Sequence, residues 1–381
     1  MSKKINVAVI FGGRSGEHEV SLVSAKSVVD ALDKDKYEIV PIGITKEGQW
    51  FTGSDPIKTL KNEENPAIKK RAVLPPDRDI RGIVILTAGS SEGEFVFDRI
   101  IPVDVIFPVL HGPYGEDGTI QGLFEMADIP FVGAGVLASS CAMDKVVMKS
   151  LFKAAGLLVT EDIILKSGEW ENGKEDILGE MESRLGYPLF IKPSNLGSSV
   201  GINKAHDRTE LARFIEIAFE FDRKVLVEKA VPNAREIECS VLGNENPVAS
   251  VPGEIIPCNE FYDYEAKYVA GKSQTIAPAD LDRNMTEKVK ELAIKGYRSL
   301  NCEGMARADF LLERGTDRLY INELNTIPGF TSISMYPKLW EADGLPYSEL
   351  LDRLIELAIE RHREKDRIRK GIRLDSEWFR R

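Results

Sequence analysis

Cysteine is scarce in this sequence, and the few cysteines lie far apart. They are Cys141, Cys239, Cys258 and Cys302, and no two of them form a C-x-x-C pair. Zinc sites need clustered ligands and disulfide-stapled domains need closely spaced cysteines, so this pattern argues against both. Isolated thiols are typical of a reducing compartment, and we expect a cytoplasmic protein.

Long apolar runs and excess positive charge are also missing. No apolar stretch approaches the roughly 18 residues that a membrane-spanning helix needs. The N-terminal MSKKINVAVIFGG has no A-x-A site, so it predicts a first strand and not a signal peptide. The formal net charge of −11 argues against a nucleic-acid-binding surface. The 381 residues, of which 43% are hydrophobic, suffice for two or three domains with substantial cores.

Two nucleotide-binding motifs are incomplete. The Gly12–Gly16 loop follows an apolar strand but is not G-x-G-x-x-G, and no acidic residue closes the next strand, so a dinucleotide site is not expected. The Gly271–Ser273 segment has Ala266 where a P-loop requires glycine. Glu17 is either a favourable acid in the first turn of a helix or a ligand for an ammonium group, and its spacing alone favours the first.

The N-terminal third alternates strands and helices. Residues 5–11 (INVAVIF) predict a buried strand, and an amphipathic helix follows. The apolar positions of that helix include Val20, Val23, Val28 and Leu32. YEIVPIGI and PVDVIFPVL continue the alternation, which predicts a mostly parallel sheet in an α/β domain over residues 1–133. The charge-rich stretch 46–98 is expected to form loops or a small insertion.

Two further domains are expected. Residues 134–229 open with one helix (SSCAMDKVVMKSLFKAAG) and continue with strands PLFIKP and SVGINK, helix ELARFIEIAFEF and strand KVLVEKAV. Residues 230–381 carry REIECSVLG and PVASVPGEII, which predict antiparallel strands and an α+β C-terminal half. A helix begins near Tyr347. Its charged end, RHREKDRIRKGIR, is interpreted as a solvated helix face or frayed tail without a function.

The stretch from Met305 to Ser334 predicts two short strands joined by a glycine-containing turn. Because side chains alternate along a strand, Arg307 and Asp309 share one face, as do Glu323 and Asn325. A turn centred on Thr316 places Asp309 opposite Glu323 and Arg307 opposite Asn325. The opposite face of the first strand should pack in the core and consists of Ala306, Ala308, Phe310 and Leu312.

The paired acids of this hairpin suggest a cation. Two facing carboxylates repel each other unless a cation lies between them. With an amide oxygen beside them they form an all-oxygen set that suits Mg²⁺ bound jointly with substrate phosphates. The alternative is a solvated polar face on an ordinary hairpin. The arginine and the following Thr-Ile-Pro-Gly-Phe-Thr-Ser loop favour a metal–nucleotide site.

Lys192 ends a predicted strand, and the Ser194–Ser199 loop of small residues then returns into another strand. Such a loop lets backbone amides close around phosphate oxygens, while the lysine supplies a positive charge. A plain hairpin loop is the alternative. The acidic pair elsewhere in the chain makes phosphate binding the better interpretation.

Two other segments have weaker patterns. Glu228 in VLVEKAV, followed by Glu236, suits a strand that offers backbone groups to a purine and a carboxylate to a ribose, although any buried strand ending in Glu-Lys looks similar. The glycine-dense loop that begins at His111 is placed for ligand contact. Its alternative is a plain helix-start turn capped by Asp117.

Taken together, these segments resemble the D-alanine–D-alanine ligase family of the ATP-grasp superfamily. The resemblance runs from Val7 to about Leu350 and rests on GGRSGEHEVS, HGPYGEDGTIQG, MDK, IKPSNLGSSVG, VEKAV, FYDYEAKY and RAD…NELNTIPGFTSIS, in the family's order. It implies an ATP-grasp architecture with an N-terminal parallel-sheet domain. It also implies ATP-dependent joining of two D-alanine molecules for peptidoglycan precursor synthesis.

The resemblance implies a site for ATP between the central and C-terminal domains. The phosphates would contact Lys145, Lys192, the Ser198 loop and Lys267. The adenine and ribose would contact Glu228, the Ala230–Val231 backbone and Glu236. Two Mg²⁺ ions, for which Mn²⁺ can substitute, would be held by Asp309, Glu323 and Asn325. A contribution from a monovalent cation such as K⁺ is left open.

The resemblance likewise implies how the substrates are held. The first D-alanine would present its carboxylate to the γ-phosphate and its ammonium to Glu17, with His111 on the substrate side. Arg307 and the Gly329 amide would stabilise the tetrahedral oxyanion, and Ser334 would bind the carboxylate of the second D-alanine. The lid residues would be Tyr262, Lys267 and Tyr268, with Tyr268 directed towards Ser198 and Glu17.

Three other functions stay open at this point. The nearest is a relative that joins D-alanine to D-lactate or D-serine, although the intact EAKY ending in Tyr268 favours the dipeptide. The others are a different ATP-grasp carboxylate–amine ligase and a non-catalytic nucleotide-binding protein on the same fold. The family expectation is a homodimer that binds small molecules and neither nucleic acid nor membrane.

Overall fold

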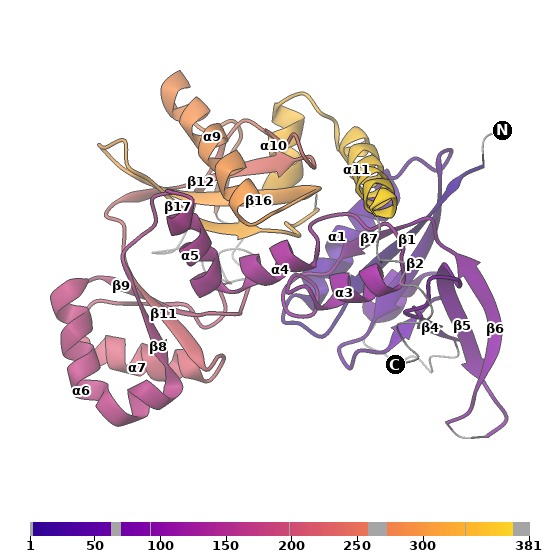
Figure 1. The fold of residues 1–381 in the computed structure, drawn as a ribbon, viewed down its shortest axis with the longest axis horizontal. Helices are drawn as coiled ribbons and strands as arrows, with labels where there is room; N and C mark the ends of the chain where they lie inside the picture. Colours follow the sequence, from indigo (N-terminus) through magenta and orange to yellow (C-terminus); the bar gives the residue numbers. More distant parts are fainter. Residues whose placement is uncertain are drawn as a thin grey trace, which may run out of the picture.

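The computed structural model contains three β-sheets with helices packed around them (Figure 1). It describes residues 3–61, 70–91, 93–197, 199–257, 273–331 and 333–368. The predicted residues Ser198, Tyr262, Lys267 and Tyr268 lie outside these ranges. No helix among the described residues is long and apolar enough to cross a membrane.

The first sheet has seven strands in the order β6-β5-β4-β3-β2-β1-β7. Its parallel part is β2 (Tyr37–Ile44), β1 (Ile5–Gly12) and β7 (Val105–Val109). Helices α1 (His18–Ala31) and α3 (Thr119–Met126) cover opposite faces. The predicted strands over residues 5–11 and YEIVPIGI are therefore confirmed.

The prediction that residues 46–98 are irregular was wrong. This stretch forms β3 (Trp50–Phe51), α2 (Pro56–Lys61), β4 (Lys70–Val73), β5 (Gly82–Ala88) and β6, which begins at Phe95 and ends at Pro102. The strands extend the first sheet in antiparallel fashion, so this sheet is mixed and only three of its strands are parallel. β3 and β4 are only two and four residues long and give little periodic signal, whereas the apolar run of β5, with Ile83 and Ile85 buried, was a signal that the prediction overlooked.

The predicted single helix before the second sheet is two helices. α4 (Val136–Met143) and α5 (Lys145–Ala154) are separated at Asp144, which has extended backbone angles. Its carboxylate accepts hydrogen bonds from the amides of Val146 and Val147 and so caps α5.

The second sheet has four antiparallel strands in the order β10-β9-β11-β8. They are β8 (Asp162–Lys166), β9 (Leu189–Pro193), β10 (Asn203–Ala205) and β11 (Lys224–Lys229). Helices α6 (Ser167–Arg184) and α7 (Arg208–Phe219) pack on this sheet through one hydrophobic core. The predicted strand SVGINK is shorter than expected, because only its last residues pair with β9.

The third sheet is antiparallel and has the order β15-β14-β12-β16-β17, with β13 paired to β12. Its strands are β12 (Ala234–Leu242), β13 (Val248–Ala249), β14 (Gly253–Ile256), β15 (Gln274–Ile276), β16 (Met305–Glu313) and β17 (Leu319–Asn325). Helices α5 and α9 (Arg283–Ser299) share a core with one face, in which Ala306, Ala308, Phe310 and Leu312 are buried as predicted.

The C-terminal helices connect the third sheet to the first. α10 (Met335–Ala342) packs on the third sheet, and α11 (Tyr347–Arg367) runs back beside α1 and β7 (Figure 1). The interpretation of the charged end of α11 as a solvated face was wrong for Arg361, which is buried. The three sheets lie in residues 5–109, 162–229 and 234–325, and the domain divisions at 133/134 and 229/230 stay predictions.

Candidate functional site

A cavity of about 830 Å³ is bordered by residues from all three sheet-containing regions. The start of α1, the loop after β7, the start of α5, the loop after β9 and the β16–β17 hairpin all contribute to its wall. The predicted site residues that line it are Glu17, His111, Lys145, Arg307, Glu323, Asn325, Gly329 and Ser334. Residues distant in the sequence thus converge on a single space.

The remaining predicted residues that the structure describes are not among those lining this cavity. They are Lys192, Glu228, Ala230, Val231, Glu236 and Asp309. Lys192 and Glu228 lie on the neighbouring strands β9 and β11, whereas Asp309 pairs with Arg307. Nothing in the geometry assigns ligand contacts to Ala230, Val231 or Glu236, so their roles stay predictions.

Arg307, which lines the cavity, forms a two-pronged ion pair with Asp309. Arg307 Nε and Nη2 each lie 2.7 Å from an oxygen of Asp309, and Nε lies 3.1 Å from Glu238 Oε2 on β12. Burial lowers the pKa of Arg307, but the carboxylates of Asp309 and Glu238 outweigh it and raise that pKa well above its usual value. The guanidinium is therefore always charged and held in one orientation.

The predicted strand pairing of this hairpin is confirmed. Asp309 is opposite Glu323, Arg307 is opposite Asn325, and a bulge follows Asp309. Asn325 Nδ2 donates to Asp309 Oδ2 over 2.9 Å. The donor set of two carboxylates and an amide oxygen fits a hard divalent cation. Arg307 donates to both oxygens of Asp309. The other two donors of the set, Glu323 and Asn325, line the cavity.

The loop after β7 contributes a residue that the sequence analysis missed, Glu116. It lines the cavity and accepts hydrogen bonds from the amides of Gly112 (2.7 Å) and Ile327 (3.2 Å). Burial and then the nearby Glu17 raise the pKa of Glu116 to about 8. The acid within HGPYGEDG was the available signal, but one of its two partners, Ile327, lies 211 residues away in the sequence. Asp117 accepts from the Thr119 amide at the start of α3, but the N-cap residue is Gly118, so the expected capping by Asp117 is not seen.

His111 fastens the loop after β17 to the first sheet. Its Nδ1 donates to the Ile327 carbonyl over 3.0 Å, which leaves Nε2 to accept from the Ser24 hydroxyl at 3.2 Å. Burial lowers the pKa of His111, consistent with a neutral ring in this position. The Phe330 carbonyl accepts from the Tyr347 hydroxyl at 2.8 Å. Together these bonds hold the backbone on both sides of Gly329.

Gly329 and Ser334 lie close together at one end of the cavity. A Cβ atom on Gly329 would lie 2.8 Å from Ser334 Oγ, which leaves no room for a side chain. Ser334 Oγ itself lies 2.7 Å from Thr331 Oγ1 and accepts from the Thr331 amide at 3.1 Å. The predicted apolar positions Val20 and Val23 of α1 border the cavity, and Val23 is exposed, so they are not core residues.

Glu228, Lys149 and Lys192 form a cluster of charges with little exposure to solvent. Lys192 Nζ is 2.5 Å from Glu228 Oε2, and Lys149 Nζ donates to Glu228 Oε1. Burial alone would raise the pKa of Glu228, but Lys192 and Lys149 lower it to about 2, so the carboxylate is ionised. Lys145 Nζ donates to the Leu196 carbonyl over 2.5 Å. Lys149 was not predicted as a site residue, although its spacing of four from Lys145 places both lysines on one side of a helix.

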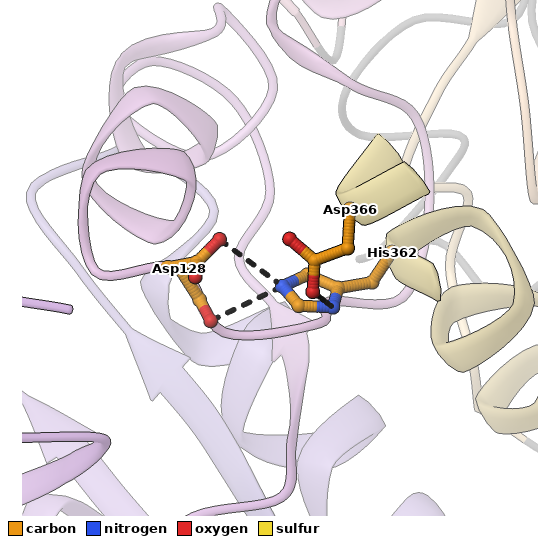
Figure 2. A group of neighbouring side chains, drawn as sticks. All are labelled: Asp128, His362 and Asp366. Carbon is orange, nitrogen blue, oxygen red and sulfur yellow. Dashed lines mark hydrogen bonds and ion pairs between the residues drawn. The ribbon is translucent and has the colours of Figure 1, made fainter. Parts of the chain in front are cut away.

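Another group of potential metal ligands lies away from the cavity (Figure 2). Nε2 of His362 is 3.3 Å from Asp128 Oδ1, whereas Nδ1, on the other side of the ring, is 3.7 Å from Asp366 Oδ2. Arg78 contacts both acids, at 2.7 Å from Asp128 and 3.8 Å from Asp366. One metal ion cannot use both ring nitrogens, and a guanidinium already balances the carboxylates. The group is therefore an ion-pair cluster that fastens α11.

Comparisons with known proteins agree over nearly the whole chain. Family models described as D-ala D-ala ligase N-terminus and D-ala D-ala ligase C-terminus match residues 6–134 and 151–356. The D-alanine–D-alanine ligase of Heliobacterium modesticaldum is 51% identical over 96% of this chain and 97% of its own length. That of Thermoanaerobacter sp. (strain X514) is 54% identical over 96% of this chain and 99% of its own length.

Solved structures give the same result. The VanG D-Ala:D-Ser ligase from Enterococcus faecalis is 38% identical, with a TM-score of 0.81, and the match covers 93% of this chain and 100% of that one. The D-alanine-D-alanine ligase from Coxiella burnetii is 36% identical, with a TM-score of 0.81, and the match covers 96% and 97% of the two chains. This chain therefore belongs to the D-alanine–D-alanine ligase family.

Proposed function

We propose that the protein joins two D-alanine molecules to D-alanyl-D-alanine and converts ATP to ADP and phosphate, as a step in peptidoglycan precursor synthesis. The observation that carries the proposal is the convergence of Arg307, Glu323 and Asn325 with Glu17 and Gly329 around one cavity. The near-complete match to relatives named D-alanine–D-alanine ligase supports the same reaction. The composition and family are in keeping with a cytoplasmic homodimer, which we include in the proposal.

The first step is transfer of the γ-phosphoryl group to the carboxylate of the first D-alanine. A carboxylate oxygen attacks the γ-phosphorus, ADP leaves, and D-alanyl phosphate forms. Glu17 pairs with the ammonium of this D-alanine, and Lys145 and Lys192 balance the negative charge of the phosphates. Phosphoryl transfer depends on positioning and positive charge, which these side chains supply without a covalent nucleophile.

The second step is attack by the amine of the second D-alanine on the carbonyl carbon of the acyl phosphate. The amine loses a proton, phosphate leaves, and the peptide bond forms. The Arg307 guanidinium and the Gly329 amide stabilise the oxyanion of the tetrahedral intermediate, and Ser334 binds the carboxylate of the attacking D-alanine. Loss of one such donor typically costs about 3 kcal/mol of transition-state stabilisation.

A divalent metal ion belongs to this proposal. Asp309, Glu323 and Asn325 would hold two Mg²⁺ ions, and Mn²⁺ can replace them. When bound, the metal neutralises charge on the transferring phosphoryl group. The register of β16 and β17 supports the set, because it brings the two carboxylates and the amide to one face of the hairpin.

The second substrate must be chosen from D-alanine, D-serine and D-lactate. One structural neighbour is named a D-Ala:D-Ser ligase, and another a D-alanine-D-alanine ligase. The intact EAKY sequence supports D-alanine, although its Tyr268 lies outside the described residues. We therefore propose D-alanine as the second substrate in preference to D-serine or D-lactate.

The experiment supplies Mg-ATP with D-alanine, L-alanine, or D-alanine mixed with D-serine or D-lactate, and measures phosphate release and product mass. We expect D-alanyl-D-alanine and equimolar phosphate from D-alanine alone, nothing from L-alanine, and mainly the dipeptide from the mixtures. Phosphate without dipeptide would indicate another acceptor. No phosphate with any D-amino acid would overturn the proposed function.

A further inference from the structure

Lys149 is a buried lysine that the proposed reaction does not yet use. Its side chain is 3% exposed, and its ammonium contacts four groups. It donates to Glu228 Oε1, to the Thr160 hydroxyl at 2.9 Å and to the Thr160 carbonyl at 3.1 Å, and it lies 3.5 Å from Asp162 Oδ1. A lysine is rarely buried this fully unless its charge is paired, so the arrangement fixes this ammonium in place.

Glu228 is bound by the ammonium groups of two lysines, and the two differ in how firmly other residues fix them. Lys149 occupies Oε1 and is held at the same time by Thr160 and Asp162. Lys192 occupies Oε2 and lies 3.1 Å from Asn322 Oδ1. Lys192 is the next-to-last residue of β9, close in sequence to the predicted phosphate loop, and its side chain is more exposed than that of Lys149. Of the two, Lys192 is therefore the one that nucleotide phosphates can draw away.

Withdrawal of Lys192 would leave Glu228 dependent on Lys149. A buried carboxylate that loses its only counter-charge either takes up a proton or destabilises the site. Because Lys149 stays bound to Oε1, Glu228 keeps its charge and its orientation, and Oε2 becomes available to a new donor. An exocyclic amino group of a purine is such a donor, whereas a carbonyl oxygen at the same position would be repelled.

We propose that Lys149 is a positioning residue that keeps Glu228 ionised and oriented so that the site accepts a 6-amino purine and rejects a 6-oxo purine. The inference rests on the proposed function and on the family expectation that Glu228 contacts the adenine of ATP. The lowered pKa of Glu228, to which both lysines contribute, is consistent with a carboxylate that stays charged during turnover. Lys149 itself contacts no reacting atom.

The alternative is that Lys149 only ties α5 to the second sheet, and Lys153 provides the matched control. Lys153 is one turn further along α5 and lies 2.5 Å from Asp162 Oδ1, with 51% of its side chain exposed. Like Lys149 it links the helix to β8, but no contact with Glu228 is seen among the described residues. A purely structural role would make the two lysines differ in stability and not in nucleotide selection.

The test compares the wild type with Lys149→Met, Lys149→Arg and Lys153→Met, with ATP and inosine triphosphate as phosphoryl donors and D-alanine as acceptor. Inosine triphosphate differs from ATP by a carbonyl in place of the 6-amino group. For Lys149→Met we expect a KM for ATP about tenfold or more higher, as for loss of a hydrogen bond to a charged group. Its preference for ATP should fall by a similar factor, with kcat at saturating ATP and the KM for D-alanine nearly unchanged.

The controls separate the possible failures. Lys149→Arg should recover part of the ATP preference, and Lys153→Met should match the wild type. A folded Lys149→Met that keeps the wild-type KM and ATP preference would overturn the inference. If that variant does not fold, a wild type that uses inosine triphosphate as well as ATP would overturn it equally. A wild type that makes no dipeptide with ATP would instead show failure of the proposed function itself.

Discussion

Two arginines, the partly buried Arg307 and the buried Arg361, illustrate how differently this protein uses the same side chain. Arg307 borders the cavity, is 17% exposed and contacts the carboxylates of Asp309 and Glu238. Arg361 on α11 is 4% exposed and donates to two backbone carbonyls, from Nη1 to Gly133 at 2.5 Å and from Nη2 to Phe131 at 2.8 Å. One arginine is held by charges and the other by the backbone.

The difference extends to their pKa values. Burial lowers the pKa of Arg361, and the more distant acids do not make up for it. At Arg307 the adjoining carboxylates outweigh burial, and the pKa rises. The Arg307 guanidinium is charged and borders the cavity, so it can form an ion pair with negative charge that develops on a ligand. The Arg361 guanidinium donates to two backbone carbonyls and lies 4.6 Å from the Phe131 ring centroid. It therefore fixes the backbone at Phe131 and Gly133, which follow the first sheet in the sequence.

The largest expected effect on activity comes from Arg307→Lys. Lysine keeps the charge but loses the two-pronged geometry towards Asp309, and its ammonium cannot reach the oxyanion in the same orientation. We expect kcat to fall by about 100-fold or more, while the melting temperature changes little. Steady-state kinetics and thermal unfolding of the same preparation measure both. A variant with wild-type kcat would remove Arg307 from the proposed chemistry.

Arg361→Met should have the opposite profile. The change leaves the Phe131 and Gly133 carbonyls buried without their donor, which we expect to lower the free energy of unfolding by about 3 kcal/mol. Activity per folded molecule should stay within about twofold of the wild type, since no reacting group contacts Arg361. Urea unfolding with active-site titration separates the two quantities. A large loss of kcat in a fully folded variant would contradict the structural role.

Glu116→Gln tests whether a buried acid in the cavity wall makes the free energy of unfolding depend on pH. The pKa of Glu116 is raised to about 8 in the folded protein, so the folded state binds more protons than the unfolded state between the ordinary carboxyl pKa and pH 8. Stability contributed by the protonated form is therefore lost as the pH rises through that window. In the variant we expect the free energy of unfolding to fall less steeply with pH, by about 1 kcal/mol per unit or less. Identical slopes would contradict the assignment.

The smallest effect is expected from His362→Gln. The imidazole joins Asp128 and Asp366 at the end of α11, but Arg78 contacts the same acids (Figure 2). We expect a loss of about 1 kcal/mol or less in stability and no change in kcat. Metal analysis of the purified wild type offers a second check. A stoichiometric ion that disappears in the variant would show that the cluster binds metal after all.

Sequence patterns were sufficient to predict structural features that depend only on residues close together in the chain. The period of two in β16 and β17 and the short turn between them determine that Asp309 faces Glu323, and this pairing was predictable. The parallel strands β1 and β2 were predictable for a similar reason, because each is a continuous apolar run. Family resemblance then added the expected roles of residues such as Lys145, whose surroundings no local pattern describes.

Features that depend on distant partners were not predictable. Lys149 and Glu228 are 79 positions apart, and Arg361 and Gly133 are 228 apart. A lysine or arginine in a charged helix looks solvated until the facing backbone or carboxylate is known. The short strands β3 and β4 were missed for the same reason, since the pairing of Phe51 with Arg71 has no apolar run to indicate it, whereas β5 does contain an apolar run.

The most direct test of the proposed reaction follows one oxygen atom. D-alanine labelled with ¹⁸O in both carboxylate oxygens is incubated with the enzyme and Mg-ATP, and the phosphate and dipeptide are analysed by mass spectrometry. If D-alanyl phosphate forms, each released phosphate carries one ¹⁸O and the new peptide carbonyl retains one. Unlabelled phosphate, or label in a nucleotide product, would contradict the acyl phosphate route.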